Sequence, residues 1–204
     1  MKTLNENSKV AVEGHVVIKD IDSGEVLLDK YNAINFQNFA YAVAQALGPD
    51  GTTYGISKLA LGRGGSNVES NGTVTYNEPK VNGATGELYT PCKDNSVSPA
   101  VDLTVPITAS QFTVNNAANQ PYSDLECKVV LDYDFPADAD ALDNSSLIDQ
   151  DVDTNFVFDE IGLMTDASSG SDGSFLTHLI FHPIQKSKNR KLEILYTLRI
   201  RAGV

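Results

Sequence analysis

The stretch that decides the fold runs from Asn35 to Val68, NFQNFAYAVAQALGPDGTTYGISKLALGRGGSNV. Asn35 is a favourable N-cap, because its side chain can accept a hydrogen bond from a free amide of the first helical turn. Gly48 and Pro49 then stop the helix. We therefore predict one helix of about three turns over residues 36–47, lying across the end or face of a β-structure. Its apolar stripe is Phe36, Phe39, Ala40, Val43, Ala46 and Leu47.

Nearly all other periodic segments of the chain are typical of β-strands. Residues 10–20 and 25–30 form an opening hairpin around a turn at Ile21–Gly24, and residues 56–61 form a strand after the helix. The last strand sets Leu192, Ile194, Tyr196, Leu198 and Ile200 against polar neighbours, which is strict two-residue alternation. Further strands are predicted at 103–108, 111–114, 126–135, 156–164 and 175–184. Pro106 marks the first of these as an edge strand.

The predicted fold class is mainly β: an antiparallel β-sandwich with one short α-helix and long loops, forming a single domain over 1–204. Residues 1–8 are polar and are expected to form a flexible arm. Residues 68–100 are rich in Asn, Gly, Thr, Ser and Pro and form a loop-rich excursion, with short β-like runs at 73–76 and 87–90. Residues 136–153 form an acidic loop between two strands.

Composition excludes several classes of partner. The net charge of −12 argues against nucleic acid, because phosphate binding requires clustered Lys and Arg. No apolar run approaches the length of a transmembrane helix, and the first ten residues lack the apolar segment of a signal peptide, so neither a membrane partner nor standard secretion is expected. Cys92 and Cys127 have no metal-ligand spacing and are interpreted as two reduced thiols.

Motifs that resemble catalytic or metal sites have simpler structural explanations. The glycines of GRGG, at 62–65, lack the spacing of a phosphate loop and precede no helix, so a structural turn is favoured. His178 and His182 lie in a β-run, about 13 Å apart, and cannot share one metal without a bend. The aspartates of the acidic loop fail the EF-hand pattern, although an irregular Ca²⁺ site there stays open. We assign no catalytic, cofactor-binding or metal-binding residues and expect no enzyme and no cofactor.

Charge is unevenly distributed along the chain. Residues 124–160 contain twelve acidic residues and one lysine, whereas residues 186–201 contain six basic residues and one glutamate. If the two regions lie on different faces, copies of the chain can dock acidic patch to basic patch, as rings and tubes require. The alternative is that the charges serve solubility alone.

Beyond these patterns, the chain resembles a loosely conserved group of structural proteins of tailed bacteriophages. The resemblance is carried by VEGHVVIKDIDSGEVLLDKYNAIN, NFAYAVAQAL and ISKLALGRGG in the first third, and by DEIGLMT and LTHLIFHPIQKSKNRKLEILYTLRI at the end. It implies a β-sandwich that belongs to the neck, tail or baseplate of the virion, or that decorates the capsid. Its motifs are structural, so it implies no functional residues.

The sequence therefore predicts a non-enzymatic structural subunit of a virion, assembled in the host cytoplasm. Its expected partners are other virion proteins and further copies of itself, as a homo-oligomer. Capsid decoration is one alternative. The other is a receptor- or carbohydrate-binding module whose sugar platform consists of Tyr54, Tyr76, Tyr89 and Tyr122.

Overall fold

The computed structural model describes residues 9–47, 55–81, 86–94, 101–116, 120–135, 156–165, 173–187 and 189–203. Its main element is a nine-stranded antiparallel sheet with the order β8-β3-β11-β12-β2-β1-β13-β10-β9. The long strands are β1 (Lys9–Asp20), β2 (Val26–Ile34), β3 (Ile56–Gly62), β10 (Tyr122–Leu131), β11 (Phe156–Thr165), β12 (Thr177–Lys186) and β13 (Leu192–Gly203). The mainly β class and the antiparallel sheet agree with the prediction.

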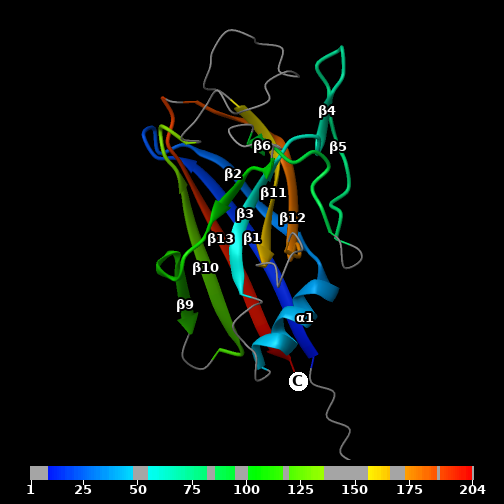
Figure 1. Cartoon of the computed structure of the whole chain (residues 1–204), viewed down its shortest axis with the longest axis vertical. Helices are drawn as coiled ribbons and strands as arrows, with labels where there is room; N and C mark the ends of the chain where they lie inside the picture. The colour runs from blue at the N-terminus through cyan, green and yellow to red at the C-terminus, as the bar shows by residue number, and fades with distance from the viewer. Residues whose placement is uncertain are drawn as a thin grey trace, which may run out of the picture.

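The sheet curls until its two edges face each other. The edge strands are β8 (Thr104–Pro106) and β9 (Phe112–Asn116), and only Ile107 to Gln111 connects them, through the short helix η1 (Ala109–Gln111). A flat sheet of nine strands would put its edges about 38 Å apart. Six residue steps span at most about 22 Å. The sheet therefore bends into the sandwich-like half-barrel of Figure 1, and β8, which carries Pro106, is the predicted edge.

The core fills the space inside this curled sheet. In β13 the side chains of Leu192, Ile194, Tyr196 and Leu198 are buried, which confirms the predicted alternation. The rings of Phe158 and Phe181 meet edge to face, with centroids 5.6 Å apart. Such a pair adds to the burial energy of two large apolar side chains.

The opening hairpin is confirmed. The carboxylate of Asp20 accepts hydrogen bonds from the amides of Asp22 and Ser23, and Gly24 takes a positive φ of 73°. Arg190, from the β12–β13 connection, donates to the same Asp20 carboxylate at 2.5 Å. The hydrogen bond from Arg190 is the largest cause that holds the pKa of Asp20 below its usual value.

The single helix α1 (Phe36–Leu47) has the predicted bounds, and Asn35 caps it as predicted by accepting from the amide of Asn38 at 3.1 Å. Its apolar stripe is only partly buried. Phe39 is buried, but so is the polar Asn38, whereas Phe36 is 66% exposed. The helix is held by polar contacts, because Asn38 Nδ2 donates to the carbonyl oxygen of Phe175 at 2.7 Å.

Several strand boundaries differ from the sequence prediction. The run 73–76 does form a strand, β5 (Val74–Tyr76), paired with β4 (Ser66–Val68), but 87–90 forms none. The strand predicted over 126–135 covers 122–131 instead. Two-residue strands β6 (Lys93–Asp94) and β7 (Val101–Asp102) form a small separate pair. The arm at 1–8 and the acidic loop at 136–153 lie outside the described residues.

Candidate functional site

The GRGG turn, which directly precedes the loop-rich excursion, is built around Asp159 on β11. The amides of Gly64, Gly65 and Ser66 donate to the Asp159 carboxylate at 2.8 to 3.1 Å, and the Ser66 hydroxyl donates to it at 2.6 Å. Successive amides of this kind form an anion-binding nest. Because a carboxylate of the same chain fills this nest, the GRGG segment is a structural turn and the phosphate-loop interpretation has no support.

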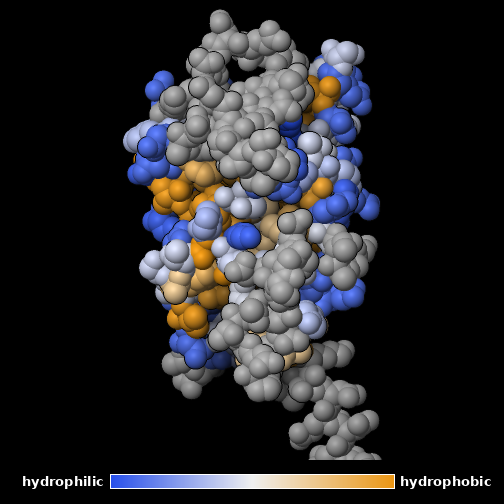
Figure 2. All heavy atoms as spheres, viewed as in Figure 1, coloured by the Kyte–Doolittle hydropathy of each residue, from blue (hydrophilic) through white to orange (hydrophobic). Residues whose placement is uncertain are grey.

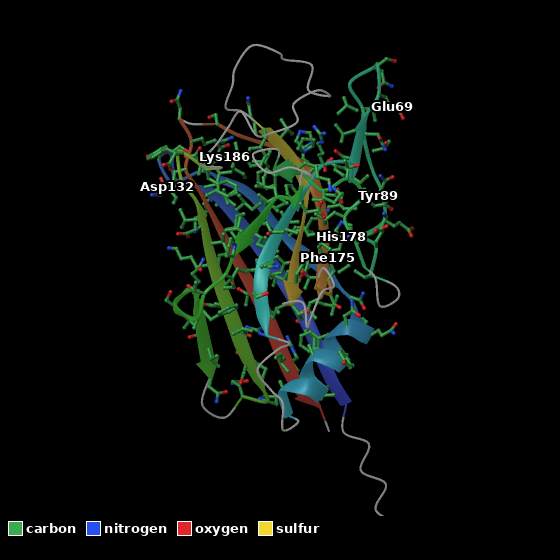
Figure 3. All side chains as sticks on the ribbon, viewed as in Figure 1. Glu69, Tyr89, Asp132, Phe175, His178 and Lys186 are labelled. Carbon is green, nitrogen blue, oxygen red and sulfur yellow. The ribbon has the colours of Figure 1, made fainter. Side chains whose placement is uncertain are left out.

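The second part of the excursion is held by the neighbouring residue, Glu160. Its carboxylate accepts from the amide of Tyr89 at 2.9 Å and from that of Thr90 at 3.0 Å. It also lies 3.0 Å from Nε2 of His178 on β12, and both side chains are buried. Figure 3 shows Tyr89 and His178 close together beside β12, and their ring centroids are 6.2 Å apart.

A buried Glu–His pair invites comparison with a catalytic dyad, but its hydrogen bonds argue for a different role. Nδ1 of His178 accepts a hydrogen bond from the backbone amide of Lys80 at 2.8 Å. The ring proton is therefore on Nε2, which donates a hydrogen bond to Glu160. Both ring nitrogens and both carboxylate oxygens are thus engaged with the fold. The pair fixes the position of the excursion instead of presenting a general base to a substrate.

The role of Asp159 and Glu160 as anchors of the covering loops was not predicted, although the sequence contains a signal for it. They are two consecutive acids inside the apolar run FVFDEIGLM, and such acids need polar partners when buried. The strand register shifts between Phe158 and Glu160, where β11 pairs with β12. This irregularity lets both acidic side chains reach the covering loops.

The buried Lys186 is a third polar anchor. Its ammonium donates to the carbonyl oxygens of Ser187 at 2.9 Å and Tyr133 at 3.4 Å. Burial lowers the pKa of Lys186, whereas Asp132 and Asp134 act in the opposite direction. Lys186 therefore ties the end of β10 to the end of β12, as the labels of Lys186 and Asp132 in Figure 3 indicate.

The three histidines have separate partners. His15 lies 2.7 Å from the carboxylate of Asp29, and His182 lies 3.4 Å from the hydroxyl of Tyr76. His178 belongs to the Glu160 pair. Among the described residues, no group of three His, Cys, Asp or Glu side chains is arranged to hold a metal ion. The proposed irregular Ca²⁺ site falls in the acidic loop, outside those residues.

The tyrosines of the carbohydrate alternative are not gathered into one platform. Tyr122 lies on β10, four strands away from β12 in the sheet order, and stacks under Arg199 with its ring centroid 4.2 Å from the guanidinium carbon. Tyr89 stacks with Lys80 at 4.3 Å, and Tyr76 lies under Lys30 at 5.6 Å. Tyr54 is outside the described residues.

The acidic and basic regions do not occupy separate faces where the structure describes them. β10 and β13 are neighbours, and Arg199 binds Asp124 through two hydrogen bonds of 2.7 Å. Lys191 binds Asp132 at 2.9 Å, and Lys128 binds Glu193. The hydrogen bond from Arg199 lowers the pKa of Asp124 and raises that of Arg199 itself. These pairs join the two regions within one chain. Six of the twelve acidic residues lie in the acidic loop, outside the described residues, so docking of acidic to basic patches stays a hypothesis.

Two shallow depressions are lined by residues that the structure describes. One, of about 480 Å³, lies over the Asp159 turn and is lined by Arg63, Ser66, Thr90 and Pro183 among others. The other, of about 150 Å³, lies on the outer face of β1, β2 and β13 between Glu13, His15, Tyr31, Thr197 and Arg199. Its Glu13 pairs with Arg201 at 3.2 Å.

Large apolar side chains are also exposed. On α1 these are Phe36, Tyr41 and Val43, and on β9 Val114 is 67% exposed. Figure 2 shows further apolar side chains over the region of β9 and β10. Exposed apolar groups that gather in this way are typical of surfaces that contact another protein.

No helix among the described residues is long and apolar enough to cross a membrane. Comparison of the chain with models of known protein families, with curated proteins and with solved structures finds no match.

Proposed function

We propose that this chain is a non-enzymatic structural subunit of a tailed-bacteriophage virion, present in multiple copies in the neck, tail or baseplate. The observation that carries the non-enzymatic part is the use of the buried ionisable groups. Asp159 accepts hydrogen bonds from the backbone of the GRGG turn, and Glu160 and His178 accept hydrogen bonds from the backbone of the excursion. Such a network fixes the shape of a loop, which is what a building block requires.

The virion part of the proposal is supported by the resemblance of the opening hairpin, the helix, the GRGG turn and the two closing strands to structural proteins of tailed phages. Apolar side chains exposed on α1 and β9 support contacts with other subunits. Its partners are then further copies of the chain and other virion proteins, and assembly takes place in the host cytoplasm.

The test is quantitative mass spectrometry of purified virions of the phage that carries this sequence. The proposal expects the chain at a fixed copy number of a few to about a dozen per particle, as ring-shaped neck, tail and baseplate parts require. A copy number in the hundreds supports capsid decoration instead. Absence of the chain from virions contradicts both.

A binding assay separates the carbohydrate alternative from assembly. The purified chain, with bovine serum albumin as a control, is applied to a glycan array and to host cells. Saturable binding that Tyr76→Ala and Tyr89→Ala abolish would replace the structural proposal with a receptor-binding one. We expect none.

A further inference from the structure

The exposed face of α1 carries an inference about how copies of the chain meet. Asn38 and Phe39 are buried and Ala42 is partly buried, so the helix rests on the sheet by this side. Phe36 is 66% exposed, Val43 is 39% exposed, and Ala40 is also exposed. At about 100° per residue, the centre of this second face lies roughly 110° around the helix from the buried side. The helix therefore presents most of its apolar stripe to the outside.

The face is free of charge in a strongly acidic chain. There is no Asp, Glu, Lys, Arg or His between Lys30 and Asp50, although the whole chain has a net charge of −12. Two such chains repel each other, and bringing like charges together at a contact is unfavourable. A charge-free apolar face is the place where two copies can approach without that cost.

The face is also complementary to itself in size. Phe36, Ala40 and Ala44 form a row with i, i+4 spacing, and all three are exposed. Rows of this kind interlock in the most common class of helix packing. If two copies of α1 pack antiparallel about a twofold axis near Ala40, the large Phe36 of each copy meets the small Ala44 of the other.

We infer that α1 is a contact between two copies of this chain, formed by Phe36, Ala40, Val43 and Ala44 about a twofold axis. This inference rests on the proposed function, because it names the surface through which the subunits assemble. A twofold contact closes on itself as a dimer, so a ring of six or twelve copies would need a second, head-to-tail contact between these dimers.

Disulfide trapping tests the geometry. In the full chain, Ala40→Cys puts a thiol next to its own copy at the twofold axis, and Val114→Cys puts one at another exposed apolar site, on the β9 edge. The native Cys92 and Cys127 are buried and serve as an internal background. Under mild oxidation we expect a cross-linked dimer from Ala40→Cys and none from Val114→Cys. Cross-linking of Val114→Cys alone would overturn the inference in favour of pairing through the sheet edge.

Sedimentation velocity tests the energetics. Val43→Asp places a charge on the exposed face, where the monomer tolerates it, and circular dichroism checks that the variant is folded. We expect the dissociation constant of the dimer to rise by about tenfold or more, the effect of losing a central apolar contact. Gln37→Asp, on α1 toward the edge of this face, is the matched control. It should raise the dissociation constant of the dimer less than Val43→Asp does.

The two proposals fail in different ways. A wild-type chain that stays monomeric, or a dimer that survives Val43→Asp, contradicts the α1 contact whatever the virions contain. Absence of the chain from virions contradicts the proposed function, even if α1 pairs as inferred.

Discussion

The carboxylate of Glu160 on β11 lies 3.0 Å from Nε2 of His178 on β12, and each residue holds a different part of the same covering loop. Glu160 accepts the amides of Tyr89 and Thr90, and His178 accepts that of Lys80. Two side chains of the sheet thus supply acceptors for backbone amides of a segment that reaches the strand ladder only at its end, through the Gly62–Pro91 bridge. The consequences of this relationship can be measured.

Replacing Glu160 with Gln should destabilise the protein and loosen the loop. A Gln side chain presents an NH₂ group to at least one of the three donors, so a buried amide loses its acceptor at a cost of about 1 to 3 kcal/mol. Urea denaturation measures the change in unfolding free energy, and hydrogen exchange measures the amides of Tyr89 and Thr90. Glu87→Gln is the control, because the Glu87 carboxylate is 68% exposed in its pair with Lys80. Equal stability of the two variants would contradict the assigned role of Glu160.

Gly64 should tolerate no side chain. Its φ is +116°, and an added Cβ would lie 2.7 Å from the Oγ1 of Thr90. We expect Gly64→Ala to lower the unfolding free energy by about 2 to 4 kcal/mol, from backbone strain and overpacking together. Gly24→Ala separates the two causes, because Gly24 also has a positive φ but open space around it. It should cost only about 1 kcal/mol. A Gly64→Ala variant no less stable than Gly24→Ala would refute the crowding.

Gly14 and Asn32 should be energetically coupled. A Cβ on Gly14 would lie 1.8 Å from Oδ1 of Asn32, which is a buried oxygen without a hydrogen-bond partner in the described part of the chain. Gly14→Ala alone should cost about 1 to 3 kcal/mol. The Asn32→Ala variant lacks the side chain that the new Cβ would meet. Adding Gly14→Ala to it should therefore lower the unfolding free energy much less. The check is a double-mutant cycle by urea denaturation, and additive changes would disprove the contact.

Stability should fall in acid through Asp124. The pKa of Asp124 is held below its usual value of 3.8, chiefly by the hydrogen bond from Arg199. A carboxyl with a lowered folded pKa contributes stability above its unfolded pKa and loses it as pH falls through the folded pKa. The advantage of wild type over Asp124→Asn should therefore be constant above about pH 5 and shrink below pH 4. Unfolding measured from pH 7 to pH 2 checks this, and a constant difference over the whole range would contradict it.

The two cysteines should be unreactive in the folded chain. Burial raises the pKa of Cys92 to about 12 and that of Cys127 to about 11, and the thiolate is the reactive form. We expect negligible reaction with a thiol reagent at pH 8, and two thiols per chain once the protein is unfolded in urea. Fast reaction of the folded protein would show that the core opens. The native thiols could then also form disulfides in the trapping experiment.

Local sequence patterns were sufficient for the elements with strict periodicity. The alternation in β13, the turn of the first hairpin and the bounds of α1 all follow from side chains that are neighbours in sequence. The orientation of α1 did not follow, because the hydrogen bond from Asn38 to Phe175 joins residues far apart in the chain. An apolar stripe shows which face avoids water, but not whether the sheet or another molecule covers it.

Long-range contacts also explain what the sequence could not show about the site. The loop amides that bind Asp159 and Glu160 lie 70 to 95 residues away, so the role of the acidic doublet depends on how the covering loops fold back. The pairing of β10 acids with β13 bases likewise depends on strand order. Patterns of charge along the chain gave no indication that the two regions would be neighbours.

The most direct test of the account is a cryo-electron microscopy map of the virion, at a resolution that identifies this chain. We predict that the chain occupies a ring of the neck, tail or baseplate and that Phe36 and Val43 of one copy pack against α1 of another. A map in which the chain is absent, or in which α1 faces solvent in every copy, would contradict the account.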